Sequence, residues 1–162
     1  MPDGFLYYAS IGFLAIALII AAITDLRSRK IGNRLVLAVM VVAPLFWFAS
    51  GLSLWPGVPL QIGFALIVFA ILYALWSFGL VGGGDIKLLT AIALWAPPVP
   101  FLQMLIVMAL AGGVLSVVFA IAHFKRKRSE RMSLPYGVAI TIGGLWMVST
   151  RLLADAPTAS AI

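Results

Sequence analysis

The stretch FGLVGGGDIKLLTA, residues 78–91, places an acidic residue, Asp85, directly after three glycines and between two long hydrophobic segments. The rest of the chain avoids charge: 64% of its 162 residues are hydrophobic and only 10% are charged, against roughly 25% in a soluble domain. A water-soluble domain of this size could not cover so much apolar surface. The composition therefore predicts a membrane protein. A carboxylate between its hydrophobic segments is energetically costly, which indicates that Asp85 has a specific role.

Hydrophobic segments on both sides of this stretch predict transmembrane helices. A helix needs about 20 apolar residues to cross a bilayer. The expected helices are Phe5–Thr24, Leu35–Leu54, Gln61–Phe78, Ile86–Ala96, Phe101–Phe124 and Pro135–Leu153, with a turn at WPGVP, residues 55–59. The fourth has only eleven residues, too few for a hydrocarbon core of about 30 Å. We therefore expect an all-α, polytopic membrane protein, a six-helix transmembrane bundle with a short fourth helix.

The length of the chain allows one domain. We expect a single transmembrane domain over residues 1–153 and a disordered C-terminal tail over residues 154–162. The first hydrophobic segment lacks the positively charged start of a secretory signal, so we interpret it as a retained helix. Cysteine is absent and His123 is the only histidine, so neither a metal site nor an organic cofactor is expected.

Basic residues predict how the bundle is oriented in the membrane. Ten of the eleven Lys and Arg residues lie in or beside the connections between helices one and two, three and four, and five and six. These connections share one side of a six-helix bundle, which the positive-inside rule assigns to the cytoplasm, with both termini outside. The loop KRKRSER, residues 125–131, is expected to rest on anionic lipid rather than nucleic acid. Trp55 and Trp95 are expected in an interfacial belt.

Two of the five acidic residues have no simple solvent role. Asp3 and Asp155 lie near the termini and Glu130 lies in the basic loop, whereas Asp25 and Asp85 each follow a helix that ends at the cytoplasmic face. An ionisable group within a membrane segment is a functional candidate. Two neighbouring carboxylates can share a proton, so that the ionised one activates water and the protonated one polarises a carbonyl. Repulsion and desolvation raise one pKa in such a pair.

Residues around the two acids are candidates for substrate binding or structural support. The three glycines before Asp85 are Gly82, Gly83 and Gly84. Their backbone leaves room for an extended peptide to approach closely. Lys87 lies two positions after Asp85, so on a helix the two side chains do not face each other. Asn33 either orients the loop that follows Asp25 or caps the second helix.

Three segments together resemble one known family. VGGGDIKLL, residues 81–89, is similar to the G-x-G-D-x-K-L signature of the type IV prepilin peptidases, which are membrane aspartic proteases. TDLRSRKIGNRL, residues 24–35, resembles the second acidic segment of that family, D-x(5)-I-P-N, with Gly32 in place of the proline. LPYGVAIT, residues 134–141, resembles the start of the last helix of the family.

The resemblance implies a fold, an activity and a site. Asp25 and Asp85 would be the catalytic pair of an enzyme that removes the basic leader peptide from prepilin-like, membrane-inserted proteins. The reaction would take place at the cytoplasmic face of the bacterial inner membrane, without metal or organic cofactor. Larger members carry a cytoplasmic domain with paired cysteines and also N-methylate the new terminus. This chain has neither, so it resembles the short form associated with Flp/Tad-type pili, and the resemblance gives no support for N-methyltransferase activity.

Other interpretations of the acids stay open from the sequence. Asp85 could be the N-cap of the fourth helix, and Asp25 an interfacial charge. A small proton- or cation-coupled transporter also needs buried carboxylates, but would place them near the bilayer midplane with access from both faces. A preflagellin peptidase or other GxGD-type protease shares the glycine motif. A phosphate-binding loop is disfavoured, because the Gly-Lys-Ser/Thr ending of that motif is missing.

Overall fold

The structure, a computed structural model, describes residues 4–126 and 136–155 of the chain. This part contains six α-helices and no strand: α1 (Gly4–Ser28), α2 (Asn33–Ala49), α3 (Gly57–Ser77), α4 (Gly83–Ala93), α5 (Pro98–Arg126) and α6 (Tyr136–Asp155). In the described residues, α1, α3, α5 and α6 are long and apolar enough to cross a membrane, and α2 is a shorter apolar helix. The expected all-helical, multi-pass membrane bundle is confirmed. Residues 127–131 of the basic loop and residues 156–162 of the predicted tail lie outside the described residues.

Several helix boundaries differ from the prediction, two of them at the turn between α2 and α3. The turn expected at residues 55–59 is shorter, because α3 already begins at Gly57. Pro59 fits there, since the first turn of a helix has no use for the missing N–H group. The second helix ends at Ala49 rather than Leu54, where the chain turns through Gly51 in a left-handed conformation with φ of 70°. Glycine adopts this conformation without a steric penalty and commonly ends helices.

The fourth helix begins earlier than predicted. Its first residue is Gly83 rather than Ile86, and its last is Ala93 rather than Ala96. The N–H group of Ile86 already donates to the carbonyl of Gly82, at 3.2 Å. Glycine lowers helix propensity, which is why the sequence placed the start after Asp85. As a result Asp85 belongs to the first turn of α4 rather than to the preceding loop.

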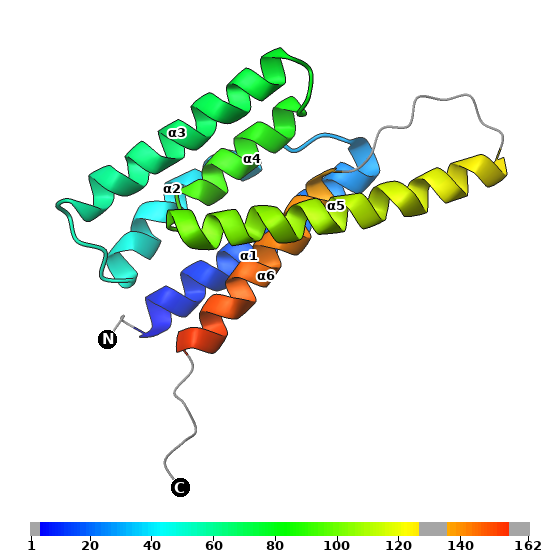
Figure 1. The fold of residues 1–162 in the computed structure, drawn as a ribbon. Helices are drawn as coiled ribbons and strands as arrows, with labels where there is room; N and C mark the ends of the chain where they lie inside the picture. The colour runs from blue at the N-terminus through cyan, green and yellow to red at the C-terminus, as the bar shows by residue number, and fades with distance from the viewer. Residues whose placement is uncertain (1–3, 127–135, 156–162) are drawn as a thin grey trace, which may run out of the picture.

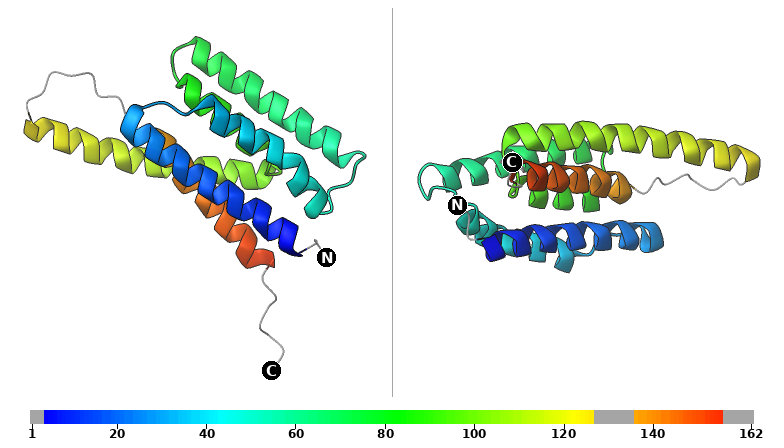
Figure 2. Two further views of the ribbon diagram at one scale, coloured as in Figure 1. Left: turned by 180° about the vertical axis from the view of Figure 1, so that it is seen from behind. Right: turned by 90° about the horizontal axis from the view of Figure 1, so that it is seen from below.

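Helices α4 and α6 occupy the middle of the bundle. Helix α6 packs against α1 and α5, and α4 packs against α2, α3 and α6. Figure 2 shows α1 and α5 on opposite sides of α6. The α1–α2 and α3–α4 connections, the end of α5 and the start of α6 all lie at one end of the bundle (Figure 1). We call this the connection end; α1 begins and α6 ends at the opposite end (Figure 1).

The short helix α4 ends inside the bundle, where side chains from three other helices bind the carbonyl groups of its last residue and of the three residues that follow it. The contacts are Trp47 Nε1 to the carbonyl of Leu94 (2.7 Å), Gln61 Nε2 to those of Ala93 (2.6 Å) and Ala96 (2.8 Å), and Arg151 Nη1 to that of Trp95 (3.0 Å). The last carbonyls of a helix have no partner within it, and in lipid an unpaired carbonyl is costly. These contacts allow a helix of 11 residues to end where it does.

The position of Trp95 corrects a sequence prediction. Its side chain is only 2% exposed, so it does not lie in an interfacial belt. The indole N–H group donates to the carbonyl of Val39 at 3.0 Å, and the ring stacks on Phe46 with centroids 5.0 Å apart. Because α4 ends inside the bundle, the residue that follows it fills the core. Trp55, by contrast, is 80% exposed.

Candidate active site

Asp25 lies in the last turn of α1 and is only 7% exposed. Its Oδ2 atom accepts a hydrogen bond from the backbone N–H group of Gly137, at 2.8 Å. Gly137 is the second residue of α6, and the first N–H groups of a helix have no partner within the helix. They also carry a partial positive charge that favours a carboxylate. The start of α6 therefore holds one oxygen of Asp25 in a fixed position.

The chain turns sharply after Asp25. Arg29 adopts a left-handed conformation, with φ of 52°, and its N–H group donates to the carbonyl of Asp25 at 2.8 Å. This conformation is uncommon for a residue other than glycine and costs of the order of 1–2 kcal/mol. It ends α1 and directs residues 30–32 across the connection end toward α4. The loop that follows Asp25 therefore leads directly to the start of α4, which carries Asp85.

Asp85 is the third residue of α4 and is half-buried. The N-cap of α4 is Gly82, without a side-chain cap, so the interpretation of Asp85 as the cap is wrong. The carboxylate of Asp85 instead folds back over Gly82: a methyl group at Gly82 would lie 2.7 Å from Asp85 Oδ2. Glycine at this position therefore makes room for the acid itself.

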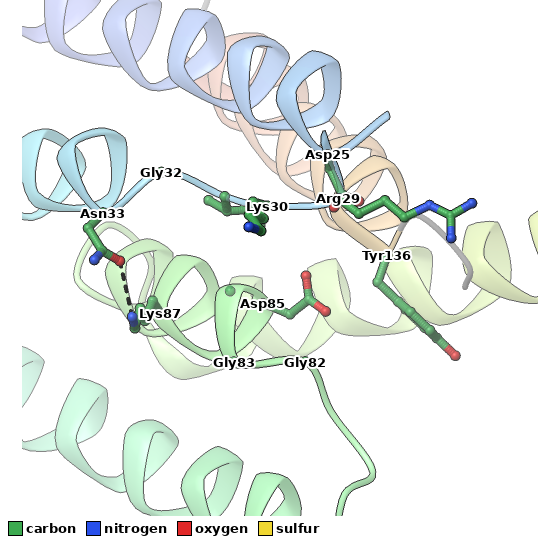
Figure 3. Close-up of a pocket in the computed structure, with 12 residues that line it drawn as sticks. Asp25, Arg29, Lys30, Gly32, Asn33, Gly82, Gly83, Asp85, Lys87 and Tyr136 are labelled. Atoms are coloured by element: carbon green, nitrogen blue, oxygen red, sulfur yellow. Dashed lines mark hydrogen bonds between the residues drawn. The ribbon is translucent and has the colours of Figure 1, made fainter. Parts of the chain in front are cut away.

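Both acids line one pocket of about 710 Å³ at the connection end. Figure 3 shows Asp25 on one wall, from α1, and Asp85 on another, from α4. The remaining lining residues come from the α1–α2 connection, the start of α4 and the start of α6: Arg29, Lys30, Ile31, Gly32, Asn33, Gly82, Gly83, Gly84, Lys87 and Tyr136. The site residues named from the sequence are thus brought together in one place.

The two acidic motifs meet residue by residue. Ile31 packs on Gly84, where a methyl group would lie 3.4 Å from the Cβ atom of Ile31. Asn33 Oδ1 accepts a hydrogen bond from Lys87 Nζ at 3.0 Å (Figure 3). Gly84 and Lys87 are three positions apart, so the two contacts lie on one face of α4. The spacing of the two motifs therefore brings the α1–α2 connection against the start of α4.

Asn33 does not cap the second helix, which was one of the two roles that the sequence left open. The N-cap of α2 is Gly32, and the side chain of Asn33 bonds to Lys87 rather than to the loop after Asp25. The glycines also contact the chain itself: Gly82 is covered by Asp85, and Gly84 by Ile31. A role of these residues in binding a substrate remains a prediction.

The environment of Asp85 favours its protonated form. Burial, and secondly the negative charge of Asp25, raise the pKa of Asp85 from 3.8 to about 6. Asp85 lies in the first turn of α4, which is not among the helices long enough to span a membrane. Lys87, the nearest basic residue in sequence, is bonded to Asn33. Near pH 6, Asp85 is thus present in both its protonated and its ionised form, as a group that gives or takes a proton in hydrolysis must be.

Sequence analysis missed two residues of the site. Tyr136 lines the pocket, and Gly137 binds Asp25 through its backbone N–H group. A methyl group at Gly137 would lie 2.8 Å from the Cβ atom of Asp25, so this position also requires glycine. The signal was present in LPYGVAIT, but that segment indicated only a helix start. Among the described residues, no three His, Asp or Glu side chains gather closely enough to bind a metal ion.

Comparison with known proteins identifies the family of this chain. The sequence model of the type IV leader peptidase family matches residues 12–121, more than half of the chain. The matched segment contains Asp25, Asp85 and both connections that line the pocket. No curated protein and no solved structure matches the chain. The extent of the family match shows that this chain belongs to the type IV leader peptidase family.

Proposed function

We propose that this membrane peptidase is an aspartic endopeptidase that removes the basic leader from Flp-like type IV prepilins. Asp25 and Asp85 are the catalytic pair in this proposal. The observation that carries it is the position of two carboxylates, sixty residues apart in sequence, in one pocket at the connection end. The family match supports a leader peptidase in general, and the aspartic mechanism is inferred from these two side chains.

The chemistry follows from the surroundings of each acid. Asp25, which accepts a hydrogen bond from Gly137, takes a proton from a water molecule as general base. Protonated Asp85 donates a hydrogen bond to the carbonyl oxygen of the scissile amide. The water oxygen adds to the carbonyl carbon, and the C–N bond breaks as the nitrogen accepts the proton that Asp25 took from water. The products are a free leader carboxylate and a new amino terminus.

The charged side chains of the pocket determine where the basic leader of the substrate can bind. Arg29, Lys30 and Lys87 share the pocket with the two acids, so it does not attract further positive charge. We therefore place the basic residues of the leader outside the pocket, in water or on anionic lipid headgroups. The distribution of basic residues supports an orientation with the connection end on the cytoplasmic side of the bacterial inner membrane and both termini outside.

The transporter interpretation gains no support from the position of the acids. Transport requires that a buried carboxylate be reached alternately from both sides of the membrane. Here the pocket that holds both acids lies at the connection end, and α4 ends among bonded side chains rather than at a second opening. A peptidase needs access from one face only.

Substitution of each acid tests the proposal. We expect Asp25→Asn and Asp85→Asn each to lower leader removal by at least about 10²-fold, because an amide can neither accept nor supply the required proton. Asp155→Asn, at the opposite end of the bundle, is the matched control and should process normally. The ratio of precursor to mature pilin in cells measures the effect, and the amount of membrane-inserted enzyme is checked in parallel. Normal processing by either active-site variant would refute the assignment.

A further inference from the structure

A groove that neither acid lines runs between α2 and α3. Both helices pack on α4, which closes the groove from behind, and they hardly touch each other. The groove has a volume of about 370 Å³, and we call it the α2–α3 groove. Its walls are the apolar side chains of Val36, Leu37, Met40 and Phe69. Leu37 and Phe69 are exposed, so the groove opens to the surroundings of the bundle, which for these apolar helices are lipid.

Two polar side chains of α4 also line the α2–α3 groove. Lys87 Nζ donates to Asn33 Oδ1 at 3.0 Å. That partner is a neutral amide and an ammonium group has three N–H donors, so charge and donors remain for an anion. Thr90 lies three positions after Lys87, on the same face of α4 and about 4.5 Å farther from the connection end. The groove is therefore cationic near the connection end and apolar beyond it.

The hydroxyl group of Thr90 lacks a hydrogen-bond partner within the described residues, although its Oγ1 atom is buried. By contrast, Thr24, Ser116 and Thr150 donate to a carbonyl three or four residues earlier in their own helices. A buried hydroxyl group without a partner costs free energy. Threonine on a helix uses two side-chain conformations. A rotation of Thr90 turns its hydroxyl group into the groove, where a ligand can supply an acceptor.

We propose that the α2–α3 groove binds one glycerophospholipid. Lys87 binds its phosphate, Thr90 donates to an ester carbonyl, and an acyl chain lies along the apolar walls. The lipid carries these three groups in the same order, and its glycerol unit separates phosphate and ester by a distance comparable to the about 4.5 Å between Lys87 and Thr90 along α4. Because Asn33 and Lys87 line both spaces, the phosphate lies at the edge of the active-site pocket.

The polar groups favour a phospholipid over other occupants of a membrane groove. A free fatty acid offers a carboxylate to Lys87 but no second polar group to Thr90. A transmembrane helix has its backbone carbonyls bonded within the helix, so its backbone offers no acceptor to Thr90. The ester carbonyl of a phospholipid is free to accept. This site does not depend on the proposed cleavage reaction, because binding of the lipid can be measured without a substrate.

Native mass spectrometry of the purified, delipidated protein in detergent tests the site. The probe is dioleoyl phosphatidylethanolamine, which carries the phosphate without a net negative charge, so general attraction to the basic connection end contributes little. The Kd is measured for the wild-type protein, Thr90→Val and Met40→Trp. Two matched controls are Thr150→Val, whose hydroxyl group already has a partner, and Leu110→Trp, on the exposed face of α5.

We expect binding of one lipid per chain by the wild-type protein and by both controls. Thr90→Val should raise the Kd about 5-fold, the contribution of one neutral hydrogen bond. Its thermal unfolding temperature without lipid should not fall, because valine removes a buried hydroxyl group that lacks a partner. Met40→Trp fills the groove and should raise the Kd at least about 10-fold, the effect of losing about two buried methylene groups.

Three results would overturn the proposal. An equal Kd for the wild-type protein, Thr90→Val and Met40→Trp would mean that lipid binds only to the general surface of the bundle. A clear loss of thermal stability in lipid-free Thr90→Val would mean that its hydroxyl group has a partner in the protein. Dioleoylglycerol, which lacks the phosphate, and oleate, which lacks the ester, should each bind more weakly. Equal binding of either would refute the positions given to phosphate and ester.

Discussion

At the residue scale, Gly137 contributes to the site because it has no side chain, which leaves room for Asp25. Its N–H group holds Asp25 at 2.8 Å, and any side chain would occupy the space of that acid. We expect Gly137→Ala to displace Asp25 and to lower kcat by about 10²-fold, the effect of misplacing a reacting group by about 1 Å. Cleavage of a precursor by purified enzyme measures the loss.

Gly144→Ala is the control for that substitution. Gly144 lies on the same helix, and a methyl group there would come within 2.7 Å of a methyl group of Leu18, which ends a flexible side chain about two turns before Asp25 on α1. We expect a small loss of thermal stability and near-normal kcat. Equal kcat values for the two variants would show that Gly137 does not position Asp25.

The raised pKa of Asp85 predicts a specific pH dependence. Burial and the charge of Asp25 place this pKa at about 6, so Asp85 is protonated below pH 6 and ionised above it. If protonated Asp85 polarises the amide, kcat/KM should fall through pH 6, approaching a tenfold loss per pH unit. A pH profile from 5 to 8 in detergent measures it, with tryptophan fluorescence as a control for folding. Constant activity from pH 6 to 8 would contradict the role given to Asp85.

The sequence allowed the acids to be found but not the groups that hold them. Asp25 and Asp85 were identifiable because carboxylates are rare in an apolar chain and each carries a motif. Gly137 acts through a backbone N–H group that every residue except proline possesses, so its identity indicates no donor. The bond of Asn33 to Lys87 joins side chains 54 residues apart and depends on the packing of α2 against α4.

At the element scale, α4 shows which features of a helix can be predicted. Its shortness follows from the proline-rich segment APPVP, residues 96–100, which stops the hydrophobic run. Its ending inside the bundle does not follow, because the side chains that bind its carbonyls lie 32 to 56 residues away. The sequence analysis assigned Trp95 to the membrane interface because the sequence did not show that α4 ends inside the bundle. Helix propensity describes a helix in isolation, whereas the residues at which a helix starts and ends also depend on the helices packed around it.

Gln61 makes two of these contacts, since its side-chain amide nitrogen binds the carbonyls of Ala93, the last residue of α4, and of Ala96. Gln61→Leu leaves both without that donor. We expect a loss of about 1–3 kcal/mol in the free energy of unfolding, the usual cost of an unpaired buried polar group. Thermal unfolding in detergent measures it. Gln103→Leu, an exposed glutamine on α5, is the control, and an equal loss there would contradict the role of Gln61.

At the scale of the whole molecule, alternation of apolar segments predicted the arrangement of the bundle. The α1–α2 and α3–α4 connections meet at one end, together with the end of α5 and the start of α6, and the two acidic motifs contact each other there (Figure 1). The sequence could not predict that α4 and α6 form the middle of the bundle. All six segments are apolar, so their hydrophobicity does not indicate which of them is most buried. The burial of each helix is determined by its contacts with the other helices.

A pair of introduced cysteines can test which side of the membrane the connection end faces, because the chain contains no cysteine. Ser53 and Ser77 lie near opposite ends of α3, and both are exposed. The basic connections assign the Ser77 end to the cytoplasm. A membrane-impermeant maleimide should therefore label Ser53→Cys in intact cells and Ser77→Cys only after permeabilisation. The reverse pattern would place the two acids outside the cell, where the leader of a cytoplasmic precursor cannot reach them.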